Sequence, residues 1–147
     1  MIMDASEDKN PGDVDGITPL HWAAANAHIE IMKCIMDTQE EKNPADINGY
    51  TPLHYVTNPE FVNGPEWTVK DREERKRRFQ AVKLIFHNVD DRNPAAKNGL
   101  TPLHFAAWVK GEQTEIVELI LNNVTNKNPG LGTKTHFFLL SFFGRKY

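Results

Sequence analysis

The sequence predicts an all-α protein made of repeated helical units. The tetrapeptide Thr-Pro-Leu-His occurs three times, at residues 18–21, 51–54 and 101–104. A basic residue followed by Asn-Pro occurs four times, and these motifs end at Pro11, Pro44, Pro94 and Pro129. Each of the first three prolines precedes the threonine of the next tetrapeptide by seven residues. Two motifs held at a constant spacing indicate one structural unit that is used several times.

The spacing between units changes once along the chain. The first two tetrapeptides start 33 residues apart, and the second and third start 50 residues apart. The extra 17 residues lie between Tyr55 and Gln80, since the segments on either side of this stretch align. We therefore predict an N-terminal tail, three repeats and a C-terminal segment, with the insert between the two helices of the second repeat. Their bounds are 1–12, 13–45, 46–95, 96–130 and 131–147. The aromatic C-terminal segment is a tail over the third repeat, a degenerate repeat or the end of a truncated array.

Each unit carries signals for two helices. Thr18 is suited to the N-cap of a first helix, and Pro19 to its first position, where proline costs no hydrogen bond. A second helix is predicted around residues 30–36, where apolar side chains recur at helical spacing. Asn43 lies before a proline, which disfavours the α conformation and ends that helix. Gly16 and its equivalents supply the positive φ that a tight turn needs.

These motifs resemble the ankyrin-repeat family, most closely over residues 13–24 and again over 98–107. The resemblance covers about Asp13 to Pro129. It implies a solenoid of three helix–turn–helix repeats with short β-turn fingers, followed by a degenerate or truncated fourth repeat. The second repeat departs from the family pattern at residues 56–59, so we expect its first helix to be short.

The resemblance also implies a protein partner, bound on the concave face by finger tips and by the exposed side of the first helices. Position by position, the expected finger contacts are Asp15, Ile17, Asn48, Tyr50, Asn98 and Leu100. The expected exposed positions on the first helices are Ala25, Asn58 and Trp108. The alternative for Ile17, Tyr50 and Leu100 is packing within the row of fingers. Trp22, Tyr55 and Phe105 share another aligned position, which we expect to serve packing between repeats.

A highly charged stretch, residues 70–78, is predicted to lengthen the second helix of the second repeat. It contains acid–base pairs at i,i+4 spacing, which favour a solvated helix face. Its basic end allows a second interpretation, as a nuclear-import signal or an anion-binding patch. The residues of this patch are Arg75, Lys76, Arg77 and Arg78.

The histidines and hydroxyl residues of the tetrapeptides are interpreted as structural. One copy per repeat implies one repeated role, and the family resemblance implies hydrogen bonds from these histidines to neighbouring fingers and helices. The residues are Thr18, His21, Thr51, His54, Thr101 and His104. A metal site requires ligands that converge on one point, so none is predicted. The motifs of zinc proteases, phosphate-binding loops and serine hydrolases are missing, so we expect no enzyme and no cofactor. Cys34 is expected to be a small buried residue.

Charge and composition narrow the classes of partner, compartment and function that the motifs leave open. A net charge of −3 argues against a chain that binds a polyanion over its whole surface. The chain has one cysteine, no apolar run that could span a membrane and no signal-peptide pattern, which favours the cytoplasm or nucleus. The first hypothesis is a non-catalytic protein-interaction module. The alternatives are a regulatory or scaffolding fragment of a larger protein, and a nuclear factor that binds nucleic acid through residues 70–78. A nucleic-acid partner is disfavoured, no membrane partner is expected, and the oligomeric state is left open.

Overall fold

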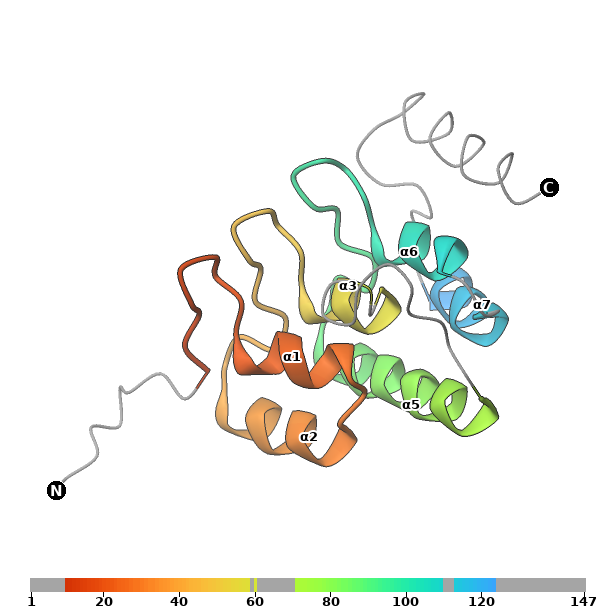
Figure 1. The fold of residues 1–147 in the computed structure, drawn as a ribbon, viewed down its shortest axis with the longest axis horizontal. Helices are drawn as coiled ribbons and strands as arrows, with labels where there is room; N and C mark the ends of the chain where they lie inside the picture. The colour runs from red at the N-terminus through yellow and green to blue at the C-terminus, as the bar shows by residue number, and fades with distance from the viewer. Residues whose placement is uncertain (1–9, 59, 61–70, 110–112, 124–147) are drawn as a thin grey trace, which may run out of the picture.

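The described part of the chain folds as three pairs of helices stacked side by side (Figure 1). The computed structural model describes residues 10–58, 60, 71–109 and 113–123. Within these residues the elements are α1 (Pro19–Ala25), α2 (Ile29–Thr38), α3 (Pro52–Thr57), α5 (Arg72–Asn88), α6 (Pro102–Trp108) and α7 (Thr114–Asn123). No β-strand forms in the described part of the chain, so the predicted all-α class is confirmed. The first helices, α1, α3 and α6, form one layer, and the second helices, α2, α5 and α7, form the other (Figure 1).

Each first helix begins with the same capping arrangement. In α1 the Nδ1 atom of His21 accepts a hydrogen bond from the backbone N–H of Thr18 at 3.0 Å. His54 and His104 form the equivalent bond with their own N-cap threonines, also at 3.0 Å. Because Nδ1 accepts from a backbone donor, the neutral ring carries its hydrogen on Nε2. The tetrapeptide therefore fixes both the start of the helix and the tautomer of the histidine.

The second helices differ in length. Helices α2 and α7 have 10 residues each, whereas α5 has 17. The additional residues of α5 are at its N-terminal end, where the Asp71 carboxylate caps the helix by accepting from the N–H of Glu74 at 2.8 Å. The predicted lengthening is confirmed. Helix α3 has 6 residues against 7 in α1 and α6, as expected from its departure from the family pattern.

The core lies between the two helix layers and between neighbouring pairs. Leu20 and Leu53 are completely buried at equivalent positions of α1 and α3. In α2 the buried residues are Met32 and Met36, which share one face of the helix. Cys34 lies about 200° around the helix from Met32, so it is exposed and the expectation of a buried cysteine was wrong.

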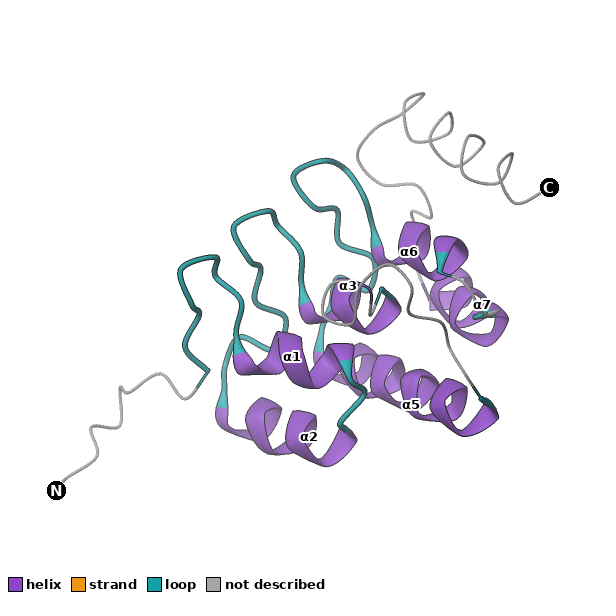
Figure 2. Cartoon of the chain, viewed as in Figure 1, coloured by secondary structure: helices purple, strands orange, loops and turns teal. Residues whose placement is uncertain are grey.

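A finger precedes each first helix, and the three fingers stand in one row (Figure 2). We define them as residues 13–17, 46–50 and 96–100, each closed by a backbone hydrogen bond between its end residues. Neighbouring fingers are joined by bonds from Ile47 N–H to the Asp15 carbonyl and from Lys97 N–H to the Asn48 carbonyl, both 2.9 Å. Gly49 has a φ of +82°, and a Cβ atom there would lie 2.9 Å from the nitrogen of Lys97. The glycine thus permits both the turn and the close approach of the next finger.

None of the helices in the described ranges combines the length and the apolar character that crossing a membrane requires.

Candidate functional site

The tips of the fingers project side chains into solvent. Asp15, Asn48 and Asn98, three of the predicted contact residues, are exposed at equivalent positions. The preceding position holds Val14 and Ile47, whose exposed fractions are 95% and 50%. The sequence interpretation missed these two apolar residues. The signal that could have found them is their shared place in the alignment, at the turn of the finger directly before the predicted contact residues.

The residues behind the tips are partly buried and link one finger to the next. The Tyr50 ring packs edge-on against His54 and Phe105, with ring centroids 5.4 and 5.8 Å apart. Its hydroxyl accepts a hydrogen bond from Asn98 Nδ2 at 2.6 Å. Tyr50 thus contacts α3, α6 and the following finger, which is the arrangement that the alternative of packing within the row describes. Ile17 and Leu100 occupy the equivalent positions and are also partly buried.

The tetrapeptide histidines connect consecutive helix pairs. His21 Nε2 donates to the Tyr50 carbonyl at 2.9 Å, and His54 Nε2 donates to the Leu100 carbonyl at 3.0 Å. Burial lowers the pKa of His54 to about 4, although its bond to Leu100 acts in the opposite direction. Burial also lowers the pKa of His21 and His104. Because burial lowers their pKa below the ordinary value, these rings stay neutral at physiological pH. His21 and His54 each serve as a fixed acceptor at Nδ1 and a fixed donor at Nε2.

The first helices expose less surface than the resemblance implied. Ala25 is completely buried and Asn58 is 6% exposed, so the expectation that both face solvent was wrong. At Ala25 the neighbouring pair lies close, because Arg78 of α5 donates to the Ala25 carbonyl at 2.8 Å. Trp108 is partly exposed at the end of α6. Together with Leu100, another predicted contact residue, it lines a hollow of about 210 Å³.

One of the four residues of the predicted basic patch is buried, and the other three are exposed. Arg75, Lys76 and Arg77 are exposed, but Arg78 is only 2% exposed and does not belong to a surface patch. Its guanidinium donates to the carbonyls of Ala25 and Val56 and to Glu74 Oε1, at 2.8, 3.2 and 3.1 Å. Burial lowers the pKa of Arg78, and the hydrogen bond to Glu74 opposes this shift.

The sequence does contain a signal for the buried arginine. Arg78, Val82 and Ile85 follow the i, i+4, i+7 pattern of one helix face, and the two apolar residues are completely buried. Among the acid–base pairs that the i,i+4 spacing of this stretch predicts, Glu74–Arg78 forms, whereas Glu73 pairs with Lys76 at i,i+3 spacing, 3.2 Å apart. The position of a residue on the helix, more than its charge, therefore determines which cation is buried in the core.

The described part of the chain was found to hold no metal-binding cluster. Within the ranges that the structure describes, no group of three or more His, Cys, Asp or Glu side chains is placed to hold a metal ion. The tetrapeptide histidines are instead distributed one per helix pair, along the stack.

Comparison with known proteins assigns the fold to a family. A model described as "Ankyrin repeats (3 copies)" matches residues 1–63, and a model described as "Ankyrin repeat" matches residues 98–130. No curated protein matches the chain. Ankyrin repeats are generally protein–protein interaction modules and are typically non-catalytic. The two matches, together with the stacked helix pairs and their row of fingers, show that the chain belongs to the ankyrin-repeat family.

Proposed function

We propose that this protein is a non-catalytic interaction module that binds a partner protein through its finger tips and the adjoining first helices. One observation carries the proposal: the finger tips form a fixed row from which apolar and polar side chains project into solvent. The single, exposed cysteine is compatible with the reducing cytoplasm or nucleus, where we place the module.

The rigidity of the row favours binding. Each finger is closed by its own backbone bonds and joined to its neighbour by another, at distances of 2.8 to 3.0 Å. A surface that is ordered before binding loses less conformational entropy when a partner docks. The fingers therefore offer a preorganised platform.

The exposed residues of the row divide into contact and support residues. Val14 and Ile47 present apolar surface, and no hydrogen bond engages the side chains of Asp15 and Asn48 within the described residues. We assign these four to direct contact. Asn98, whose amide already bonds to Tyr50, extends the row at the third finger. Ile17, Tyr50 and Leu100 hold the fingers in line, and Trp108 borders the surface at α6.

The test compares two apolar surfaces of similar exposure. Ile47 at a finger tip is 50% exposed, and Ile31 on α2 is 52% exposed. Partners are captured from cell extract with the intact chain, identified, and then titrated against a Val14→Ser/Ile47→Ser variant and an Ile31→Ser control. The proposal expects a loss of affinity of about tenfold or more in the finger variant, since apolar residues at an interface each contribute on the order of 1 kcal/mol.

The Ile31→Ser control tests whether the loss of affinity is specific to the finger surface. Circular dichroism should show the same helix content for all three chains, because the substituted residues lie on the surface. If Ile31→Ser weakens binding as much as the finger variant, or if only Ile31→Ser weakens it, the fingers are not the binding surface.

A further inference from the structure

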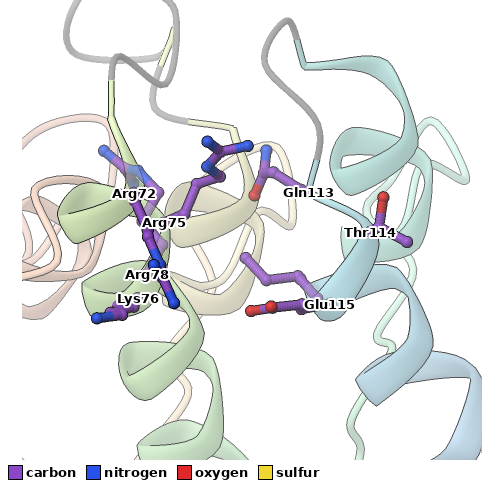
Figure 3. Close-up of a pocket in the computed structure, with 8 residues that line it drawn as sticks. Arg72, Arg75, Lys76, Arg78, Gln113, Thr114 and Glu115 are labelled. Atoms are coloured by element: carbon purple, nitrogen blue, oxygen red, sulfur yellow. The ribbon is translucent and has the colours of Figure 1, made fainter.

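A cavity of about 340 Å³ lies between the N-terminal extension of α5 and the start of α7, apart from the fingers. Figure 3 shows arginine and lysine side chains of α5 on one wall and Gln113, Thr114 and Glu115 on the other. The lining residues are Arg72, Arg75, Lys76, Arg78, Gln113, Thr114, Glu115 and Ile116. The longer α5 supplies one wall of this cavity.

The four cations that line the cavity differ in their partners. Arg78 is bound to Glu74, and Lys76 is paired with Glu73 at 3.2 Å. Arg72 and Arg75 are exposed, and neither side chain forms a hydrogen bond or ion pair with a residue in the described ranges. Two guanidinium groups are therefore available to a ligand at one cavity.

The other wall adds partial positive charge. Thr114 is the first residue of α7, and the first N–H groups of a helix have no acceptor inside that helix. The helix dipole also favours an anion at this end. Glu115 is the acidic residue of the lining and is exposed, which leaves it free to turn into solvent.

Gln113 provides an independent sign of an incomplete site. It is 6% exposed, and its Nε2 donates to the Thr57 carbonyl at 3.2 Å. This bond fixes the amide orientation, because the opposite orientation would set two oxygen atoms against each other. Oε1 is buried and has no hydrogen-bond partner among the described residues. A buried acceptor without a donor is unfavourable, so this wall favours a ligand that brings an N–H or O–H group.

We propose that this cavity binds a phosphorylated side chain of a peptide segment in the partner protein. Two guanidinium groups and a helix N-terminus match the several oxygen atoms of a phosphate monoester, and the amide beside a phosphoserine supplies a donor. An extended nucleic acid fits less well, because Asp71, Glu73 and Glu74 interrupt the basic surface of α5. The inference rests on the proposed function and adds the chemistry of one contact.

The test uses a minimal ligand, N-acetyl-phosphoserine N-methylamide, titrated into the full chain and followed by NMR. Saturable shifts are expected for the backbone amides of residues 114–116. An Arg72→Gln/Arg75→Gln variant should bind about tenfold more weakly or worse, since each charge-assisted bond is worth on the order of 1 kcal/mol or more. Arg77→Gln is the matched control, because Arg77 is an exposed arginine of the same helix outside the cavity.

Three further probes identify the source of the anion. Inorganic phosphate or N-acetyl-aspartate N-methylamide binding as tightly as the phosphoserine ligand would overturn the phosphopeptide assignment. So would the absence of saturable shifts, or equal weakening by Arg77→Gln. A DNA duplex whose binding is weakened as much by Arg77→Gln as by the Arg72→Gln/Arg75→Gln variant would assign the surface to nucleic acid instead. Because the finger variant leaves this cavity intact, failure here and failure of the finger surface are separate results.

Discussion

The first helix pair has one face that no other described pair covers, whereas the later pairs turn the equivalent face toward a preceding pair. Both kinds of face are built from the same aligned positions. Tyr55 and Phe105 are 4% and 8% exposed, whereas Trp22 at the same position is 48% exposed. The next helix repeats the contrast, since Ile31 is 52% exposed and Ala81 at the equivalent position is buried. At the position shared by Trp22, Tyr55 and Phe105, the largest side chain is thus the most exposed one.

The contrast shows that a neighbouring unit, and not residue type, determines burial in a stacked protein. Tyr55 packs edge-on against His21 of the preceding pair at 4.8 Å, and Phe105 lies near His54 in the same way at 6.0 Å. The described residues include no unit on the corresponding side of Trp22. The expectation that all three aromatic residues serve packing between repeats was therefore wrong for Trp22.

The largest expected effect comes from breaking the junction between the first two pairs at Arg78. Arg78→Ala removes hydrogen bonds to two backbone carbonyls and to Glu74, and leaves these acceptors in a buried setting. Loss of one partner of a buried ion pair costs about 3–5 kcal/mol of the free energy of unfolding. Urea denaturation followed by circular dichroism measures this change.

Arg77→Ala is the matched control, because Arg77 is exposed on the same helix. Its free energy of unfolding should change by less than about 0.5 kcal/mol. Similar losses in both variants would mean that Arg78 stabilises the helix and not the junction.

The second largest effect is a dependence of stability on pH. His54, at the junction between the second and third pairs, is buried in its neutral form. The pKa of His54 is about 4 in the folded chain and 6.5 in the unfolded chain. Between these values the unfolded chain binds the extra proton, so stability is complete above pH 6.5 and falls as the pH decreases. The loss attributable to His54 is about 2 kcal/mol by about pH 5.

Urea denaturation at about pH 7 and about pH 5 checks this dependence. His54→Gln should reduce the pH dependence, whereas His87→Gln, which changes an exposed histidine, should leave it intact. A wild-type chain equally stable at both values would contradict the neutral, buried state of His54. Burial also lowers the pKa of His21 and His104, so these residues likewise reduce the stability of the folded chain as the pH decreases.

The smallest effect sharpens the comparison at a single aligned position. Tyr55→Phe removes the hydrogen bond from the Tyr55 hydroxyl to Asp46 Oδ2, which is 2.9 Å long and buried. The expected loss is about 1–2 kcal/mol. Trp22→Phe at the exposed equivalent should change stability by less than about 0.5 kcal/mol. Thermal unfolding of the two variants compares these values directly, and a larger loss for Trp22→Phe would contradict the difference between the faces.

Much of the fold was predictable because its signals are local. Thr18 and Pro19 begin a helix through contacts within one turn, and Gly49 meets the conformational demand of its own finger. The lengthened α5 followed from an insert that ends in helix-forming charged residues. The finger contacts Asp15, Asn48 and Asn98 were found by resemblance and are exposed, and their binding role remains a proposal.

The candidate sites were less predictable because they depend on contacts across the stack. Arg78 belongs to a basic run in the sequence, yet it is the only residue of that run buried in the described structure. The cavity beside it joins residues more than 30 positions apart, which no local pattern connects. Val14 and Ile47 differ from these examples, because their shared position at the finger turn was a local signal that the sequence interpretation missed.

By itself, the sequence determined where helices begin, where fingers turn and how many times the unit recurs, because caps, turns and periodicity act over a few residues. Only the tertiary structure decided which side chains these elements cover. Trp22 and Tyr55 occupy one position of one motif, and they differ because a helix pair packs against Tyr55. Burial depends on that neighbour, and the neighbour is set by stacking between units and not by the sequence around the residue.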